Sequence, residues 1–425
     1  MEEKVQDGQQ DMLADVLEVA TEAGHIMLEN GAEIARVEET MARISAHYGV
    51  TTRHTYILSN GIFTTGNAAD GTPVQHKSSY ANIDYIPIKG TQMDKIVATN
   101  RLSRDIVAGK YTIEEAKAEL RNIRAMKPKP AWEQILGSAI GSSAFCAVFG
   151  GGFLDCAASF VVGIFLWMFV MWVTAPRFSK ILANILNGAL VALLCLAFWS
   201  IGFGRSLGNM IVGSLIPLIP GVAFTNGIRD LTNEDYLAGT TRMLDALVVF
   251  FGIAVGSCLV LIIQGYFAGG VIMLSGAGTD PETATVLIQT FAGFFSTVAF
   301  AILFGAPRNQ YVAAGVVGAI SWGFYFILIK YTGFSVIAST FATSFLTAVL
   351  ARWTAVIRKC PITVFLICGL CPLIPGGGIF WTTYFFISEQ YRLAMQSGIT
   401  ALSATIAIVL GIVVVTGLPK HMKKK

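Results

Sequence analysis

The pattern of apolar and polar positions divides the chain into two parts. Up to about residue 130, apolar side chains recur at helical or strand spacing between polar ones, whereas from Trp132 onward long apolar runs follow one another. Each run is close to the roughly 20 residues that a helix needs to cross about 30 Å of hydrocarbon. Ten such runs are present, at 133–151, 155–175, 181–201, 207–230, 238–264, 285–304, 311–329, 333–351, 361–387 and 394–418. We therefore expect an all-α membrane part with ten transmembrane helices.

The first part predicts a separate α+β domain over residues 1–131. Apolar positions between 11 and 48 recur at helical spacing, and Asn30-Gly31 interrupts them. Short runs rich in β-branched and aromatic residues then alternate with turn signals at Asn60-Gly61 and Asp70-Gly71. The predicted strands lie at 55–58, 62–65 and 83–88, and two more helices at 91–108 and 112–123. Thr112 and Glu115 form a capping-box pattern at the start of the last helix.

Composition and charge support a membrane protein and give its orientation. Only 13% of the residues are charged and 54% are hydrophobic, whereas about 25% charge is typical of soluble proteins. If the N-terminal domain lies in the cytoplasm, the far side receives only Arg205, Lys330 and Arg392. The cytoplasmic side receives Lys127, Lys129, Arg177, Lys180, Arg229, Arg242, Arg308, Arg352, Arg358, Lys359, Lys420 and Lys423 to Lys425. This asymmetry predicts a multi-pass protein of a cell membrane with both termini in the cytoplasm.

Two of the apolar runs carry the same helix-breaking motif. Pro217-Leu218-Ile219-Pro220-Gly221 lies midway along the fourth run, and the same five letters recur as Pro372 to Gly376 in the ninth. Each proline removes a backbone donor and clashes with the preceding turn, so a helix there should bend or break. In lipid the freed carbonyls need another partner, which places such a break beside protein or a water-filled cavity.

The two breaks belong to a duplication of the membrane part. Displacing the chain by 155 residues superimposes them without a gap, and the same offset aligns further identical residues. These pairs include Gln134/Gln289, Ala144/Ala299, Gly150/Gly305, Gly163/Gly318, Trp167/Trp322, Glu234/Glu389, Tyr236/Tyr391, Ile253/Ile408 and Gly256/Gly411. Each copy holds five spans, and because five is odd the second copy enters from the opposite side. The sequence thus predicts two inverted five-helix repeats, 132–265 and 285–425, with a connecting loop at 266–284 and broken fourth and ninth helices.

Several stretches resemble the threonine/serine exporter family. They are Gly31 to Met41, ending at Gly49-Val50, Asn100 to Leu102, Ile113 to Ala116 and both proline breaks. Residues 1 to about 265 resemble the component with a soluble domain and five spans, and residues from about 280 resemble the smaller membrane component. The resemblance implies ion-driven export of small polar metabolites from the cytoplasm, across a bacterial inner or plasma membrane. Some members are split into two proteins, and one split pair is associated with succinate export, so threonine/serine and dicarboxylates both stay open as substrates.

The breaks are the first candidates for a substrate site. Unwound backbone at Pro217, Pro220 and Gly221, and at Pro372, Pro375 and Gly376, would leave the N-terminal N–H groups of two half-helices facing a carboxylate. Both substrate classes carry a carboxylate, so the motif does not choose between them. The alternative is that each break is a structural kink.

Polar and aromatic residues near the breaks are further candidates. Thr225 and Asn226 follow the first break by one turn, where the second repeat has Phe380 and Trp381. Trp381 could form a wall of the cavity or face lipid and the interface. Asn184 and Asn187 share a face of the third span, as ligand contacts or as helix–helix hydrogen bonds.

Three carboxylates are candidates for coupling to protons, because an intramembrane carboxylate is costly and suggests function. Asp245 lies about two turns into the fifth span and could carry a proton, or pair with Arg242 at i−3. Asp155 lies where the first and second spans meet and could be a solvated turn residue. Asp230 could line the inner mouth or belong to a solvated charge cluster.

The sequence also argues against enzymatic chemistry. The histidines and carboxylates of the N-terminal domain show no H-E-x-x-H, G-x-S-x-G or P-loop spacing, and Cys368 and Cys371 fit small apolar helix residues better than a metal site. No cofactor, metal or nucleic acid is expected. The expected partners are a small-molecule substrate, the lipid bilayer and protons, and small-residue faces at Gly137, Gly141 and Ala144 leave a homo-oligomer open. We therefore expect a secondary transporter; a channel or a ligand-sensing membrane protein is the alternative from another class.

Overall fold

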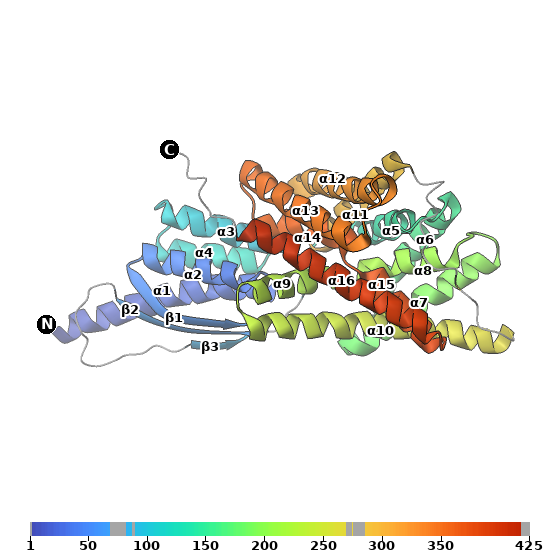
Figure 1. Cartoon of the computed structure of the whole chain (residues 1–425). Helices are drawn as coiled ribbons and strands as arrows, with labels where there is room; N and C mark the ends of the chain where they lie inside the picture. Colours follow the sequence, from blue (N-terminus) through green and yellow to red (C-terminus); the bar gives the residue numbers. More distant parts are fainter. Residues whose placement is uncertain (1, 69–81, 87–89, 269–273, 275–284, 418–425) are drawn as a thin grey trace. The chain divides into compact units, whose positions relative to one another are not determined.

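A computed structural model describes the chain except for residues 1, 69–81, 87–89, 269–273, 275–284 and 418–425 (Figure 1). The predicted turn at Asp70-Gly71, most of the predicted connecting loop and the closing lysines lie outside the described residues. The chain divides into two compact units, residues 1–128 with 225–243, and residues 129–224 with 244–425. The contacts thus group residues 225–243, which the sequence assigns to the first membrane repeat, with the N-terminal domain.

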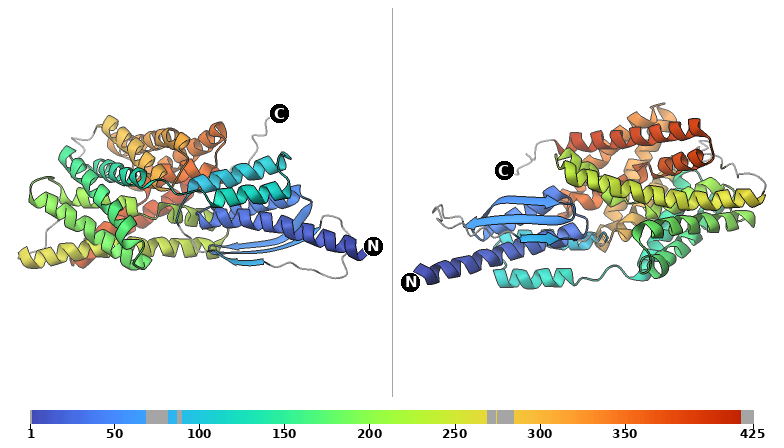
Figure 2. Two further views of the ribbon diagram at one scale, coloured as in Figure 1. Left: turned by 180° about the vertical axis from the view of Figure 1, so that it is seen from behind. Right: turned by 90° about the horizontal axis from the view of Figure 1, so that it is seen from below.

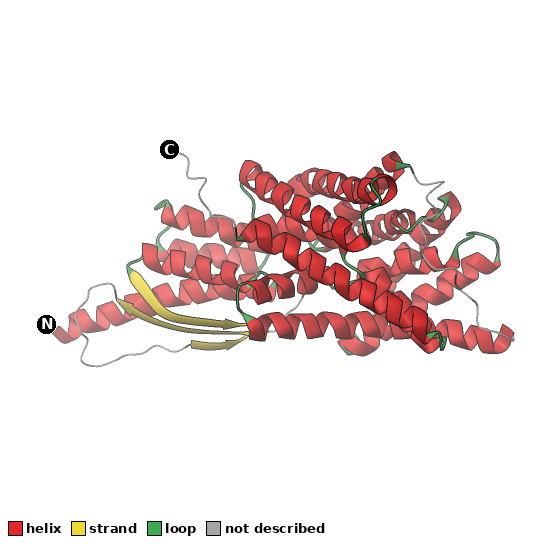
Figure 3. Ribbon diagram, in the orientation of Figure 1, coloured by secondary structure: helices red, strands yellow, loops and turns green. Residues whose placement is uncertain are grey.

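The first unit contains four helices and a three-stranded sheet from residues 1–128. They are α1 (Glu2–Glu29), α2 (Ile34–His47), β1 (Val50–Leu58), β2 (Gly61–Ala68), β3 (Asn82–Tyr85), α3 (Met93–Val107) and α4 (Ile113–Arg124). The antiparallel sheet has the order β1-β2-β3, and Leu58 pairs with Gly61 across the tight turn that the Asn-Gly pair predicts. Strands occur only in this N-terminal stretch of the described chain (Figure 3).

Buried apolar side chains of the helices and of the sheet form the core of this unit. Ile26, Met27, Val37, Met41 and Ile62 are fully buried, at the helical and strand spacing that the sequence displays. Thr112 Oγ1 accepts from the Glu115 backbone N–H at 3.3 Å and the Glu115 side chain accepts from the Thr112 backbone at 2.8 Å, which is a complete capping box. This box satisfies donors that would otherwise be unpaired at the start of α4.

The described residues of the second unit form helices joined by loops, without a strand (Figures 1 and 3). The bounds, including those of α9 and α10, which cross between the units, are α5 (Ala131–Val148), α6 (Phe153–Phe169), η1 (Val170–Thr174), α7 (Lys180–Ser200), α8 (Leu207–Leu215), η2 (Ile216–Leu218), α9 (Gly221–Thr232), α10 (Tyr236–Ala268), α11 (Val286–Leu303), η3 (Arg308–Gln310), α12 (Tyr311–Tyr331), α13 (Val336–Arg358), α14 (Ile362–Leu370), η4 (Cys371–Leu373), α15 (Gly376–Ile387) and α16 (Tyr391–Thr416). Figure 2 shows these helices from two further sides.

Length and composition support a multi-pass membrane protein. Within the described residues, eight helices are long and apolar enough to span a bilayer, or up to nine if α8 to α9, bent by 65°, count as one span. The helix α5, predicted as the first span, is not among them, because Glu133 and Gln134 lower the hydropathy of its first turn. The count of ten spans therefore stays a prediction.

The bounds of the elements recur with the offset of the sequence duplication. The pair α5 and α11, and the breaks α8–η2–α9 and α14–η4–α15, begin and end at positions 155 residues apart. Gly150 and Gly305 both have positive φ, as do Glu234 and Glu389. Trp167 Nε1 donates to Gln134 Oε1 at 3.3 Å, and Trp322 Nε1 donates to Gln289 Oε1 at 2.8 Å. The two copies therefore share local structure as well as sequence.

Two glycines on this offset permit close helix packing. A side chain at Gly256 would overlap the backbone carbonyl of Ile185 in α7, and one at Gly411 would meet Ser344 and the backbone of Phe345 in α13. Glycine allows the backbones to approach at both places, as small residues do between membrane helices. The same packing is thus made once in each copy.

Candidate functional site at two helix breaks

The two proline motifs have similar local backbone but bend the chain to different degrees. Among the described helices, α8 and α9 are bent by 65°, whereas Ile362–Ile387, which contains the second motif, counts as one span. A short 3-10 turn ends at Leu218 or Leu373, the following isoleucine is extended, and a new helix begins at Gly221 or Gly376. The Gly221 N–H donates to the Ile219 carbonyl at 2.8 Å, and the Gly376 N–H donates to the Ile374 carbonyl at 2.7 Å. Because proline lacks an N–H, the helical hydrogen-bond ladder cannot continue through either motif.

The structure brings the two breaks into contact by a reciprocal exchange. A β-carbon at Gly221 would lie 3.2 Å from Cys371 Sγ and 3.4 Å from Ile374 Cδ1, and one at Gly376 would overlap Ile219 Cδ1. Ile219 and Ile374 are equivalent on the 155-residue offset, as are Gly221 and Gly376. Each break therefore inserts its isoleucine against the first helical glycine of the other.

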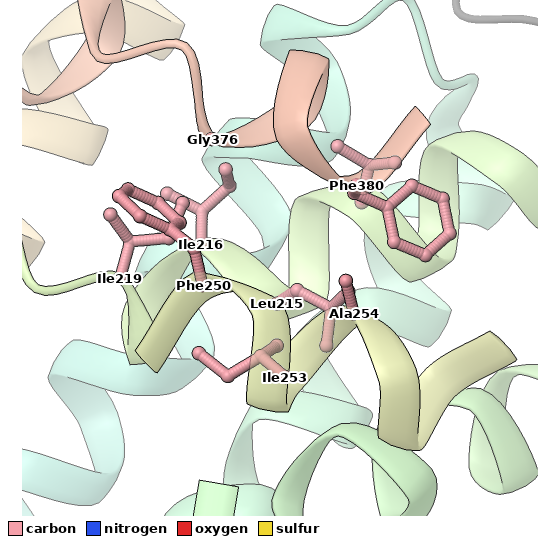
Figure 4. Close-up of a pocket in the computed structure, with 9 residues that line it drawn as sticks. Leu215, Ile216, Ile219, Phe250, Ile253, Ala254, Gly376 and Phe380 are labelled. Carbon is pink, nitrogen blue, oxygen red and sulfur yellow. The ribbon is translucent and has the colours of Figure 1, made fainter. Parts of the chain in front are cut away.

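A small, partly open cavity lies beside this crossing (Figure 4). Its lining comes from α8 and the first break, from α10, and from α15, and consists of Val212, Leu215, Ile216, Ile219, Phe250, Ile253, Ala254, Gly376 and Phe380. Every lining side chain is a hydrocarbon, and Gly376 is the first residue of α15. The cavity can accept an aliphatic group but offers no side-chain partner to a charge, which would be costly to desolvate there.

Most of the cavity could not be recognised from the sequence. Gly376 belongs to a predicted site motif, and Phe380 is the equivalent of Thr225 in the second repeat. Phe250 and Ile253 of α10 carry no signal, because one apolar residue in an apolar helix looks like any other.

Trp381 belongs to a buried aromatic cluster in α15. Its ring stacks on Phe385 at 5.4 Å and meets Tyr384 edge-on at 5.7 Å. The lipid-facing alternative is wrong, because Trp381 is 7% exposed. Its Nε1 has no hydrogen-bond partner among the described residues, whereas the Tyr384 hydroxyl accepts from the Leu274 N–H at 3.1 Å. A buried donor without a partner is costly and is available to a bound acceptor.

Asn226 lies in a different environment from its equivalent Trp381. Its Nδ2 donates to the Gly31 carbonyl at 2.6 Å, within the first unit. Thr225 is also buried in that unit. The amide of Asn226 thus binds backbone of the N-terminal domain, which the sequence did not predict.

The two asparagines of α7 differ from each other. Asn187 is buried, and its Oδ1 accepts from Thr174 Oγ1 at 3.1 Å. This contact favours the helix–helix alternative for Asn187. Asn184 is half-buried, and its β-carbon lies beside Gly252 of α10.

Asp245 and Asp155 both have defined partners. Asp245 is not paired with Arg242; both of its oxygens accept from Lys180 Nζ at 2.6 Å, and its side chain is 43% exposed. Asp155 is buried and not a solvated turn residue. It accepts from the backbone N–H groups of Gly152 at 2.8 Å, Arg205 at 2.5 Å and Ser206 at 3.0 Å. It therefore fastens the loop before α8 to the start of α6.

Asp230 is fully buried in the first unit, so the alternative of a solvated charge cluster is wrong. Its Oδ2 accepts from Arg242 Nη1 at 2.6 Å, and its Oδ1 accepts from the Ile34 N–H at 3.3 Å. Arg242 Nη2 also donates to the Ala32 carbonyl at 2.9 Å, and Arg229 forms an ion pair with Glu33. The sequence offered Arg229 as a neighbour of Asp230 but did not reveal residues 32–34.

A buried carboxylate that the sequence reading missed is Glu133 at the start of α5. Its Oε2 accepts from Arg308 Nη2 at 2.7 Å, and its Oε1 accepts from the Tyr311 hydroxyl at 2.7 Å. The three residues join α5 to η3 and α12. A carboxylate in the first turn of a predicted span was the available signal, but nothing in the sequence indicates a partner 175 residues away.

The described residues contain no group of histidine, cysteine and carboxylate side chains that could hold a metal ion. The seven cysteines are free thiols, and Cys368 and Cys371 are buried in and after α14.

Comparisons with known proteins identify relatives over nearly the whole chain. A family model described as a threonine/serine exporter matches residues 18–264, and a second, described as threonine/serine exporter ThrE, matches residues 289–418. The chain is 21% identical over 422 residues to the threonine/serine exporter of Corynebacterium glutamicum, covering 97% of this chain and 84% of that protein. It is 24% identical over 275 residues to pheromone-regulated membrane protein 10 of Candida albicans, covering 62% of this chain and 24% of that protein. No solved structure matches.

Proposed function

The chain belongs to the threonine/serine exporter family, whose members are membrane exporters and not enzymes, and we propose that it is a secondary transporter exporting threonine, serine and similar small carboxylate-bearing metabolites from the cytoplasm. The observation that carries this proposal is the reciprocal contact of the two proline breaks. Broken helices that face each other between two repeats are the usual place for substrate in secondary transporters.

The proposed mechanism is alternating access between two inverted repeats of five spans each. Support comes from the element bounds that recur at 155 residues and from the odd number of predicted spans per copy. The two repeats would rock or gate about the crossing of Ile219 with Gly376 and of Ile374 with Gly221. In this arrangement the N-terminal domain and both termini are cytoplasmic, as the distribution of basic residues predicts.

The chemistry of the cavity favours an amino acid over a dicarboxylate. An α-amino acid carries both charges at one end, so the methyl group of threonine can enter a hydrocarbon-lined cavity while its hydroxyl stays outside and its carboxylate stays at the N–H groups of a half-helix. Succinate has a charge at each end, and one of them would lose its hydration without a partner. Threonine exceeds serine by one methyl group, worth about 0.8 kcal/mol on burial, or roughly fourfold in affinity.

Proton coupling is proposed to use Asp245. A proton carrier must exchange with water, and Asp245 is partly exposed, whereas Asp155 and Asp230 are buried. When the Asp245 carboxylate takes up a proton it loses its negative charge, so its ion pair with the Lys180 ammonium would break.

Flux into proteoliposomes tests the proposal. Purified protein is reconstituted, a proton gradient is imposed, and uptake of labelled threonine, serine and succinate is compared with uptake without the gradient. We expect threonine to accumulate above equilibrium, serine to compete about fourfold more weakly, and succinate not to compete. Uptake that never exceeds equilibrium would refute active transport and leave a channel. Accumulation and preferential competition by succinate would replace the amino-acid substrate with a dicarboxylate.

A further inference from the structure

The second half of α9 and the start of α10 are bound to the N-terminal domain by a buried polar network. The contacts group residues 225–243 with residues 1–128 as one compact unit. Within it, Asn226 donates to the Gly31 carbonyl, and Arg242 binds both Asp230 and the Ala32 carbonyl. We name Glu33, Asn226, Arg229, Asp230 and Arg242, with the backbone of residues 31–34, the clamp.

The charges of the clamp are almost completely removed from solvent. The side chains of Asp230 and Arg242 are 0% and 5% exposed, and those of Arg229 and Glu33 are 9% and 5% exposed. Breaking one such pair would leave an uncompensated buried charge, which is far more costly than losing a surface ion pair. Apolar packing adds to the contact, because Ala238 of α10 lies in the core of the N-terminal domain.

The clamp is not part of the duplicated scaffold. On the 155-residue offset, Asn226, Arg229, Asp230 and Arg242 correspond to Trp381, Tyr384, Phe385 and Ser397. None of these four carries a charge, and yet α15 has the bounds of α9 displaced by that offset. A half-helix after the break can therefore form without a charged network. The clamp is thus not needed to form α9 and has a role that is specific to the first copy.

We propose that residues 225–243 move with the N-terminal domain as one rigid body, and that the clamp residues are positioning residues for transport. The helix α9 is continuous from Gly221 to Thr232 and so leads from the break into the clamped turns. A change in the position of the N-terminal domain is thereby passed to the proposed substrate site. This inference rests on the proposed function for its transport readout, but its rigid-body part stands independently.

Distances between spin labels test the rigid body directly. Labels are placed by Glu114→Cys in α4, Asn233→Cys after α9 and Trp353→Cys in α13, all at exposed positions, in a transport-competent full-length chain lacking the native cysteines. The 114–233 distance should be the same with and without threonine, whereas the 114–353 distance should shift. A substrate-dependent 114–233 distance would overturn the rigid body, and a 114–353 distance fixed in every state would overturn the motion.

Substitution of Arg242 tests the positioning role. Arg242→Met should broaden the 114–233 distance distribution and lower the maximal rate of threonine transport at least tenfold, with threonine affinity unchanged. Arg242→Lys, which keeps the charge but lacks the planar guanidinium whose two terminal nitrogens bind Asp230 and the Ala32 carbonyl, should recover part of the rate. A rate equal to that of the wild type in Arg242→Met, or an unaltered distance distribution, would contradict the proposal.

Lys117→Met is the matched control. Lys117 pairs with Asp15 and Glu18 inside the N-terminal domain, and neither of these partners belongs to the clamp. We expect its transport rate and its label distances to equal those of the unsubstituted chain. If the unsubstituted chain moves no threonine, the proposed function fails, and the effect of Arg242→Met on the 114–233 distribution still decides whether the clamp holds the unit together.

Discussion

The half-helices α9 and α15 begin at equivalent positions and have the same length, but they bind different partners. Both start at a glycine that receives the isoleucine of the other break. Beyond the first turn, α9 carries buried polar and charged residues that bind the N-terminal domain, and α15 carries the aromatic cluster around Trp381. The break and its crossing have been kept in both copies, whereas the turns that follow have diverged. We infer that the common part concerns the transport step and the different parts concern control and selectivity.

Among the differences between the two half-helices, removing the buried carboxylate of Asp230 in α9 should have the largest effect, which is on stability. Asp230→Ala should lower the free energy of unfolding by about 3–5 kcal/mol, because Arg242 would stay buried without its partner. Asp245→Ala, which removes an exposed pair with Lys180, should cost less than about 1 kcal/mol. Thermal unfolding of both variants in detergent measures the difference, and equal losses would show that burial does not distinguish the two pairs.

Removing the indole N–H of Trp381 tests what the aromatic cluster of α15 contributes. Trp381→Phe keeps a ring in the cluster but deletes the unpartnered Nε1. If that donor binds the substrate carboxylate, threonine affinity should fall by roughly 10- to 100-fold, since a hydrogen bond to a charged group contributes about 1.5–3 kcal/mol. Trp322→Phe, whose Nε1 donates to Gln289, should leave affinity unchanged. Unaltered binding by Trp381→Phe would remove Trp381 from the substrate site.

Both copies contain the same proline motif, so removing its prolines should reduce transport equally in either copy. Replacing both prolines by alanine at 217 and 220, or at 372 and 375, returns the missing N–H groups and favours a continuous helix. Each double variant should retain its fold and lose transport by about tenfold, because the crossing no longer has two broken backbones. Flux assays on matched amounts of protein measure this, and normal flux in either variant would reduce that break to a structural kink.

The smallest effect is expected at Glu38 of α2, whose carboxyl is influenced by Asp235 in the loop between α9 and α10. Partial desolvation raises the pKa of Glu38 although its side chain is exposed, and the Asp235 carboxylate adds to the increase; partial burial also raises the pKa of Asp235. A carboxyl with a raised pKa in the folded state contributes stability at low pH that is lost as pH rises through that pKa. Glu38→Gln should therefore unfold at a slightly higher temperature than the wild type at about pH 7.5, with the difference vanishing near pH 4. A lower unfolding temperature at the higher pH would mean that the charged form is favoured.

The local features of the fold were readable from the sequence. Pro217 and Pro220 act on the backbone around them, so the break follows from residue type alone. The offset of 155 residues was equally visible, because the Trp167/Trp322 pair and the second Pro-Leu-Ile-Pro-Gly cannot be confused with the general run of apolar residues. The element bounds then recur at that offset.

The partners of polar residues were not readable, because they lie far away in the chain. Asn226 binds Gly31 across 195 positions, and Glu133 binds Arg308 across 175. Asp245 illustrates the same limit, since its nearest basic residue in sequence is Arg242 but its partner is Lys180. The apolar cavity was hidden for another reason, because Phe250 and Ile253 differ from their lipid-facing neighbours only in position.

A reversible cross-link between the two breaks tests the central claim most directly. In Gly221→Cys the new β-carbon would lie 3.2 Å from the sulfur of native Cys371, within reach of a disulfide. Oxidation should form the bond and abolish threonine transport, reduction should restore it, and Gly221→Cys with Cys371→Ser should be insensitive to oxidant. Transport that continues undiminished while mass spectrometry shows complete cross-linking between positions 221 and 371 would contradict alternating access about the paired breaks.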